Sequence, residues 1–213
     1  MILRFALMTT LALAWMVPLP GTVVATGQES PPACASARWL APLAATPVAG
    51  DAARTPVAEA APAWLTAELT DACSGETFTL ADFVGKTVYV ETLATWCPPC
   101  RDQLARANEA ATSIPEVERG DVVFVALSSE VGLPRETLAA YAADNSFPFV
   151  FAVMPAAMLQ AMAGDLGREV AVPSATPHLI IAPDGTVGEL RTGGTAPDDL
   201  LTLLEEAAHP AAS

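Results

Sequence analysis

The chain has 213 residues, enough for one domain together with a targeting segment and a linker. Acidic residues outnumber basic ones by 24 to 10, which gives a formal net charge of −14. This charge argues against nucleic acid as a partner and against attachment to an anionic membrane through a basic patch. A basic protein partner stays compatible with it, although a solvated acidic surface is the simpler explanation.

Residues 1–25 resemble a secretory signal. One cation, Arg4, precedes an apolar run, and small residues follow up to Ala25, after which cleavage is expected. The apolar stretch up to Val24 is nearly long enough to span a bilayer, so retention as an N-terminal membrane anchor is the alternative. Both alternatives predict a domain outside the cytoplasm, either secreted or periplasmic, or anchored to the outer face of the cytoplasmic membrane.

Residues 26–63 are rich in Ala, Pro and Thr, and the segment Ala45–Val48 is weakly repeated at Arg54–Val57. This composition predicts an extended linker rather than a folded unit. Cys34 in the linker and Cys73 in the following domain could form a structural disulfide, as an oxidising compartment allows. Two independent thiols are the alternative.

Residues 64–209 alternate between β-type and α-type patterns, which predicts one α/β domain. In chain order the expected elements are a short strand and turn at 76–83, a strand at 87–93, a helix at 97–113, a strand at 121–127, a helix at 134–145, a strand at 149–153, a short helix at 156–162, a hairpin of strands at 178–182 and 187–191, and a helix at 197–208. Right-handed crossovers arrange them as a three-layer α/β/α sandwich, whose mixed central sheet ends in an antiparallel pair.

A single carboxylate interrupts the apolar strand predicted at 87–93. Glu91 lies in the run Val88-Tyr-Val-Glu-Thr-Leu93, where removing an unpaired carboxylate from water is costly. Burial favours the protonated form and moves the pKa of such a group towards neutral. Strand alternation could instead turn Glu91 to solvent. A strand covered by helices on both faces has no solvent face, so the buried position is favoured.

The sequence Trp96-Cys-Pro-Pro-Cys100 follows this strand and opens the predicted helix. Two cysteines one helical turn apart can close reversibly into a disulfide. The attacking species in thiol chemistry is the thiolate, and a helix N-terminus stabilises negative charge through its unpaired N–H groups and its dipole. Cys97 is therefore the predicted nucleophile of thiol–disulfide exchange, and Cys100 the resolving thiol.

Two other roles for the cysteine pair are weaker. A zinc site needs four ligands, and the remaining candidates form no second closely spaced pair; they are Cys34, Cys73, His178 and His209. A purely structural bridge between Cys97 and Cys100 would close too small a loop to stabilise the fold much.

The residues around the cysteines suggest how the pair is tuned. Pro98 and Pro99 have no backbone N–H, so the two donors that other residues would offer to the Cys97 thiolate are missing. Weaker stabilisation of the reduced form predicts a moderately reducing protein. Trp96 is expected to cover Cys97 and to offer an apolar platform for substrate binding, with a pure packing role as the alternative.

The segments Gly85–Arg101, GKTVYVETLATWCPPCR, and Ala175–Leu190, ATPHLIIAPDGTVGEL, resemble the thioredoxin-like superfamily, and most closely its TlpA/ResA-type extracytoplasmic thiol–disulfide oxidoreductases. In that family a cis-proline faces the CxxC pair and precedes a strand, an Asp-Gly hairpin and another strand. The layout from Thr176-Pro177 onwards is similar, which implies a cis peptide bond at Pro177, with Pro173 as the competing candidate.

The resemblance also implies a thioredoxin-like fold and a reaction. Reduced Cys97 attacks a disulfide of an exported protein and forms a mixed disulfide against the loop of Thr176 and Pro177, and Cys100 then releases the substrate. A membrane electron donor would re-reduce the pair, and substrates such as apocytochrome c or copper-site thiols are suggested. No organic cofactor and no metal is implied.

Two positions qualify the resemblance. The glutamate that TlpA/ResA-type proteins usually carry three residues after the second cysteine is Gln103 in this chain. Glu91 falls where thioredoxins keep a buried acid beneath the disulfide. Glu91 is therefore the predicted acceptor of the Cys100 proton, through a bridging water.

Rival functions on the same fold are less well supported. A peroxiredoxin-like thiol peroxidase needs a threonine three residues before its reactive cysteine, and Ala94 stands there. A Cu(I) metallochaperone could use Cys97, Cys100 and His178, since soft thiolates suit that ion. Related copper chaperones, however, separate their cysteines by three residues rather than two. A redox-inactive scaffold is disfavoured because both cysteines are present.

Overall fold

The central sheet has four strands in the order β5-β4-β3-β6. The computed structural model of the protein describes residues 61–115 and 118–209. β3 (Thr87–Leu93) pairs in parallel with β4 (Val122–Ser128) and antiparallel with β6 (His178–Ile181). β5 (Val150–Val153) joins the other side of β4 in parallel. The sheet is therefore mixed, as predicted.

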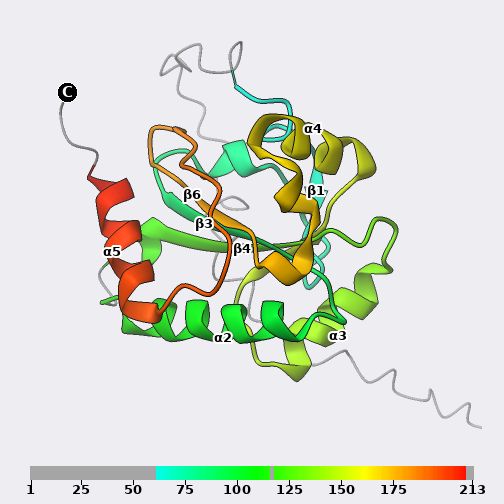
Figure 1. The fold of residues 1–213 in the computed structure, drawn as a ribbon, viewed down its shortest axis with the longest axis horizontal. Helices are drawn as coiled ribbons and strands as arrows, with labels where there is room; N and C mark the ends of the chain where they lie inside the picture. The colour runs from blue at the N-terminus through cyan, green and yellow to red at the C-terminus, as the bar shows by residue number, and fades with distance from the viewer. Residues whose placement is uncertain (1–60, 116–117, 210–213) are drawn as a thin grey trace, which may run out of the picture. The chain divides into compact units, whose positions relative to one another are not determined.

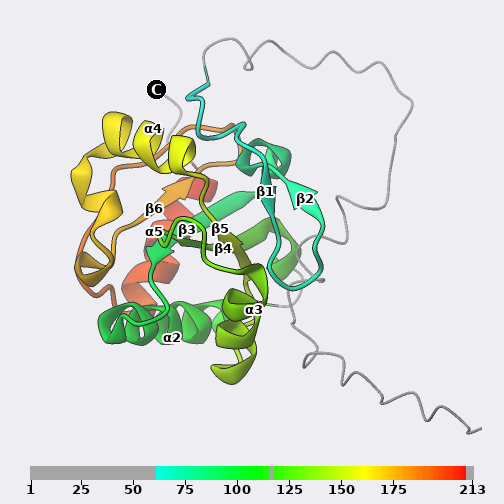
Figure 2. The ribbon, with the colours of Figure 1, turned by 90° about the vertical axis from the view of Figure 1, so that its right-hand side faces the viewer.

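Helices cover both faces of this sheet. Figures 1 and 2 show α2 on one face and α4 on the opposite face, which gives the predicted three layers. Within residues 61–115 and 118–209 the α-helices are α2 (Pro98–Ser113), α3 (Arg135–Asp144), α4 (Ala156–Leu166) and α5 (Pro197–Ala208). The short elements are the antiparallel pair β1 (Leu69–Thr70) and β2 (Thr77–Phe78), and the 3-10 turns η1 (Leu80–Phe83), η2 (Arg119–Asp121), η3 (Arg168–Ala171) and η4 (Pro173–Ala175).

The middle strand β3 is buried along its whole length. Its neighbour β4 is buried from its second residue onwards, as expected for parallel strands covered on both faces. At the start of the domain, Trp64 is fully buried and its Nε1 donates to Asp165 at 3.1 Å. This contact ties the beginning of the described chain to α4.

The main error in the predicted fold is the strand at 187–191. Only two isolated bridges form there, between His178 and Arg191 and between Ile181 and Val187. Between the two bridges β6 advances by three residues and the segment from Val187 to Arg191 by four. The extra residue forms a bulge, which interrupts a regular ladder. Gly188 lies at the bulge, where a Cβ would come within 2.8 Å of the Ile180 carbonyl oxygen.

Several predictions concern residues outside the described part of the chain. They are the signal or anchor at 1–25, most of the linker at 26–63, and Cys34 of the predicted Cys34–Cys73 disulfide. Cys73 itself is half-buried and is not a free thiol. Among residues 61–115 and 118–209, no helix combines the length and apolar character needed to cross a membrane.

Candidate active site

The first turn of α2 holds the two cysteines of the CxxC sequence. Cys97 is the N-cap of the helix, and Pro98 and Pro99 occupy its first two positions, where a missing N–H costs no helical hydrogen bond. Cys97 and Cys100 form a disulfide, with their Cα atoms 5.4 Å apart. Cys97 is 2% exposed and Cys100 is fully buried, so an incoming thiol or disulfide meets Cys97 first.

A backbone N–H stabilises the sulfur of Cys97. The amide of Cys100 donates to Cys97 Sγ at 3.2 Å, which is the bond expected between an N-cap side chain and the third residue of a helix. The second residue, Pro99, has no proton to give. An N-cap side chain accepts from the second or third helical residue, so of the two prolines only Pro99 withholds a donor from Cys97.

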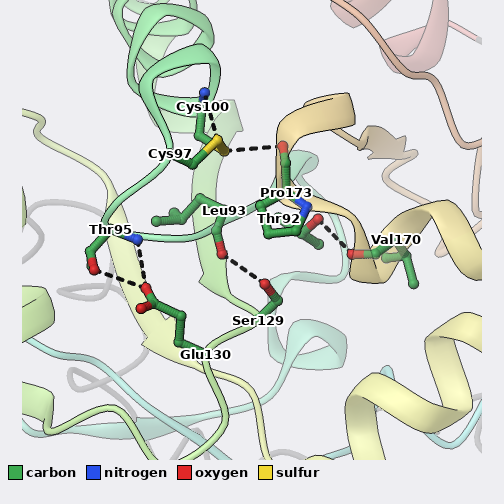
Figure 3. The surroundings of a disulfide bond; sticks show 9 residues. All are labelled: Thr92, Leu93, Thr95, Cys97, Cys100, Ser129, Glu130, Val170 and Pro173. Carbon is green, nitrogen blue, oxygen red and sulfur yellow. Dashed lines mark hydrogen bonds between the residues drawn. A yellow bond between two sulfur atoms is a disulfide. The ribbon is translucent and has the colours of Figure 1, made fainter.

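The sulfur of Cys100 lies against η4. Its Sγ is 3.1 Å from the carbonyl oxygen of Pro173 (Figure 3). In the reduced dithiol this separation allows the Cys100 thiol to donate a hydrogen bond to the carbonyl oxygen. A carbonyl partner favours the neutral thiol over the thiolate, because it accepts a hydrogen bond that the thiolate cannot give.

The cis peptide bond expected at Pro177 is wrong. Within the described residues all peptide bonds are trans, and the chain turns instead at Thr176, whose φ of 47° and ψ of 55° are left-handed. Pro177 and Thr176 are both buried. The carbonyl of Pro177 accepts from the amide of Thr92 at 2.9 Å. Pro173, the competing candidate, is the proline whose carbonyl contacts the disulfide, although its bond is trans as well.

An acidic side chain holds the loop that leads into the motif. Glu130 accepts hydrogen bonds from the backbone amide and the hydroxyl of Thr95, two residues before Cys97 (Figure 3). The neighbouring Ser129 donates to the carbonyl of Leu93, from its hydroxyl at 3.1 Å and its amide at 2.9 Å. The end of β4 thus fixes the turn between β3 and α2.

Glu91 is fully buried on the face of β3 that packs against α2, so the alternative of a solvent-exposed acid is wrong. Burial raises the pKa of Glu91 from 4.5 to about 8. The hydrogen bond from Tyr89 and the positive charge of Arg106 lower this pKa, but by less than burial raises it. Around neutral pH, Glu91 can therefore either accept or give a proton.

A hydrogen-bonded chain connects Glu91 to helix α2. The hydroxyl of Tyr89 donates to Glu91 Oε2 at 2.8 Å, and Gln103 Nε2 donates to that hydroxyl at 3.4 Å. Gln103 Oε1 in turn accepts from the amide of Thr195 at 2.9 Å. Burial raises the pKa of Tyr89, and the nearby charge of Glu91 raises it further, so Tyr89 keeps its proton.

His178 lies beside Glu91 but is held by other groups. The two residues are direct partners in the β3–β6 pairing. The imidazole Nδ1 is 2.9 Å from the carbonyl oxygen of Thr176, and Nε2 is 2.8 Å from the hydroxyl of Thr195. Burial lowers the pKa of His178, which keeps the ring neutral. Because both ring nitrogens are engaged, His178 is poorly placed to serve as the third Cu(I) ligand of the metallochaperone alternative.

Trp96 is 67% exposed, which excludes a role in core packing. Two other large apolar side chains are exposed next to residues of the site: Val172 precedes Pro173, and Val131 follows Glu130. Among the described residues, no three His, Cys, Asp or Glu side chains lie close enough together to hold a metal ion.

Four features of the site were not predicted from the sequence: Tyr89, Thr195, Glu130 and the contact of Pro173. Tyr89 could have been found, because residues two apart on a strand share a face and Tyr89 precedes Glu91 by two. Thr195 and Glu130 lie in loops, and no sequence pattern shows which strand end or helix a loop residue will reach.

The Redoxin family model matches residues 49–200 of the chain. No curated protein matches the chain. Among solved structures, the thioredoxin-family thiol:disulfide interchange protein of Chlorobium tepidum TLS is 20% identical with a TM-score of 0.55, over 66% of this chain and 92% of that one. BsSco, of the Sco family of cytochrome c oxidase assembly proteins, is 15% identical with a TM-score of 0.52, over 68% and 92%. MTB dsbF is 19% identical with a TM-score of 0.50, over 70% and 99%.

These structural similarities establish the thioredoxin-like fold, and the family match extends over most of the chain. With its redox-type disulfide at the N-terminus of α2, the protein belongs to the Redoxin family as a thioredoxin-like thiol–disulfide oxidoreductase.

Proposed function

We propose that the protein reduces disulfides in exported proteins, with Cys97 as the nucleophile, Cys100 as the resolving thiol and Glu91 as the base. The observation that carries this proposal is the different environment of the two sulfurs. Cys97 Sγ accepts a backbone N–H, which favours its thiolate, whereas Cys100 Sγ faces a carbonyl oxygen, which favours its thiol.

The reaction has two displacements. The Cys97 thiolate attacks one sulfur of the substrate disulfide, and the other substrate sulfur leaves as a thiolate that takes a proton from water. The Cys100 thiol then gives its proton, through a bridging water, to the ionised form of Glu91 and attacks Cys97 Sγ, so the mixed disulfide breaks and the second substrate sulfur leaves as a thiolate. Two electrons pass from the protein dithiol to the substrate, and the Cys97–Cys100 disulfide remains for re-reduction by a membrane electron donor.

The surface around the disulfide supports a polypeptide substrate. Trp96, Val131 and Val172 are 67%, 52% and 46% exposed, and they adjoin Cys97, Glu130 and Pro173 respectively. Exposed apolar side chains close to a reactive group are typical of a protein-binding surface. An unfolded or extended segment that carries an oxidised cysteine fits this surface. Apocytochrome c and copper-site thiols are the substrate classes we propose.

The N-terminal sequence supports a location outside the cytoplasm. Its charged start, apolar run and small residues up to Ala25 have the form of a secretory signal, or of an anchor if they are retained. An exported enzyme of this kind would meet oxidised secreted proteins and would take electrons from a membrane partner.

The test uses the full chain with Cys100→Ser and a synthetic peptide that contains one disulfide. The expected result is a stable mixed disulfide between Cys97 and the peptide, identified by mass spectrometry under non-reducing conditions. The wild type should instead release the reduced peptide, and the double variant Cys97→Ser/Cys100→Ser should trap nothing. If the wild type consumed hydrogen peroxide quickly and left the peptide oxidised, the thiol peroxidase alternative would replace this proposal.

A further inference from the structure

We propose that Tyr89 and Gln103 are positioning residues that hold Glu91 by one carboxylate oxygen and leave the other free to take the proton of Cys100. This inference rests on the proposed function, in which Glu91 is the base of the resolving step. It goes beyond that function because it assigns roles to two residues that do not react themselves.

The three side chains form a buried chain with little freedom. Tyr89, Glu91 and Gln103 are each at most 1% exposed. The bonds run from Gln103 Nε2 to the Tyr89 hydroxyl at 3.4 Å, and from that hydroxyl to Glu91 Oε2 at 2.8 Å. Tyr89 and Glu91 lie on one face of β3, and Gln103 reaches them from α2.

The direction of these hydrogen bonds is fixed by groups that can only donate. The backbone amide of Thr195 and the guanidinium of Arg106 both approach Gln103 Oε1, at 2.9 Å and 3.3 Å. The amide group of Gln103 must therefore turn its Nε2 towards Tyr89. Because the Tyr89 hydroxyl oxygen accepts a hydrogen bond from Gln103 Nε2, its own proton points to Glu91.

The remaining oxygen of Glu91 has no such partner. Within the described residues Oε1 is buried and makes no hydrogen bond. An unpartnered buried oxygen is costly to the fold, so its presence needs a reason. A proton acceptor needs one oxygen without a hydrogen-bond donor, and Oε1 meets this condition while Tyr89 holds Oε2.

The charges around Glu91 also make its proton affinity depend on the hydrogen bonds from Gln103 to Tyr89 and from Tyr89 to Glu91. The titratable or charged groups that face it are Tyr89 from β3, His178 from β6, Arg106 from α2 and Tyr141 from α3. His178 and both tyrosines are neutral, since burial lowers the pKa of the imidazole and raises those of the phenols. Tyr89 and Arg106 are thus the groups that favour the ionised carboxylate.

A glutamine at position 103 has a specific consequence. A carboxylate there would accept the Tyr89 proton instead of donating to the hydroxyl, and would compete with Glu91 for it. Two carboxyl groups linked through one hydroxyl would titrate as a coupled pair, with one of them ionising at a higher pH. Gln103 therefore keeps Glu91 as the single acid of this buried cluster.

The test follows the resolving step alone as a function of pH. The reduced full chain is mixed with 5,5′-dithiobis(2-nitrobenzoate) in a stopped-flow instrument, where Cys97 releases the first coloured thiolate and Cys100 releases the second. For Tyr89→Phe the midpoint of the second phase should move up by about one pH unit, because a hydrogen bond to the ionised carboxylate is lost. Gln103→Glu, which is close in shape, should give a second phase that titrates in two steps.

The chain offers a matched control in Tyr141→Phe, which removes the hydroxyl of the only other tyrosine and should leave the midpoint unchanged. Folding of each variant is checked by near-UV circular dichroism, and carbon-13 NMR of the Glu91 carboxyl gives its pKa directly. If folded Tyr89→Phe and Gln103→Glu both kept the wild-type midpoint and the wild-type Glu91 pKa, the positioning role would be overturned. A Glu91→Gln variant with the wild-type pH profile would instead overturn the role of Glu91 as the base, and this inference with it.

Discussion

The burial of Glu91 predicts an unusual dependence of stability on pH. In the folded protein the pKa of Glu91 is about 8, against an ordinary value of 4.5. Between these values the folded state keeps a proton that the unfolded chain has lost. The contribution of Glu91 to the free energy of unfolding must therefore fall as pH rises through this range. At about 1.4 kcal/mol per pH unit, the loss between pH 4.5 and pH 8 amounts to at most about 5 kcal/mol.

The substitution Glu91→Gln isolates this contribution. An amide does not ionise, and its oxygen can still accept the hydroxyl proton of Tyr89. We expect the stability of the variant relative to the wild type to increase with pH, by up to about 5 kcal/mol between pH 4.5 and pH 8, and to level off above. Since whole domains are stable by only about 5–15 kcal/mol, this change is large enough to measure.

The assay is urea unfolding of the oxidised protein at a series of pH values, so that thiol ionisation does not contribute. Glu109→Gln is the matched control, because Glu109 is an exposed acid on the same helix that carries Gln103. The stability of this control relative to the wild type should change little with pH. A Glu91→Gln curve that runs parallel to the wild type from pH 4.5 to pH 9 would refute the assignment of Glu91 as a buried, protonated acid.

Two further predictions concern the loop and the helix around Cys97. Pro99→Ala restores the N–H of the second helical residue, which can reach the Cys97 sulfur and stabilise its thiolate. The reduction potential, measured by redox titration against glutathione, should therefore rise by about 30–60 mV. Pro98→Ala, at the first helical position, is the control and should change the potential little. Glu130→Ala removes both hydrogen bonds to Thr95, so the free energy of unfolding should fall by about 1–3 kcal/mol. The first attack by Cys97 on a substrate disulfide should also be slower. An unchanged rate would show that the loop keeps its conformation without Glu130.

The strands and helices with strong local patterns were predictable from the sequence. β3 and α5 have the predicted bounds, because a continuous apolar run defines the first and a proline start with apolar spacing defines the second. α4 extends to Leu166, four residues beyond the prediction, and ends at Gly167 with a positive φ of 113°. The strand at 187–191 failed for a different reason, since a bulge depends on the partner strand and not on local preference.

The candidate site was predictable only in part. The spacing of Cys97 and Cys100, and the isolation of Glu91 in an apolar run, are local features of the sequence. The contact of Pro173 with Cys100 joins residues 73 positions apart, and that of Thr195 with Gln103 joins residues 92 apart. Such contacts depend on how loops cross the ends of the sheet, which a single sequence does not encode in any short pattern.

The different environments of the Cys97 and Cys100 sulfurs explain why the proposed reaction needs a base. If Cys100 were as easily ionised as Cys97, ionisation would not distinguish the two sulfurs as nucleophiles, and burial alone would direct the substrate to Cys97. The Pro173 carbonyl and the complete burial of Cys100 both favour its neutral thiol, so Cys97 attacks first. The same protection would stall the second displacement, because a neutral thiol is a poor nucleophile. In the proposed mechanism the ionised form of Glu91, whose pKa burial raises to about 8, takes the Cys100 proton during this step and afterwards returns it to water. In the proposed mechanism the neutral thiol of Cys100 thus accounts both for the order of the two displacements and for the need for a base.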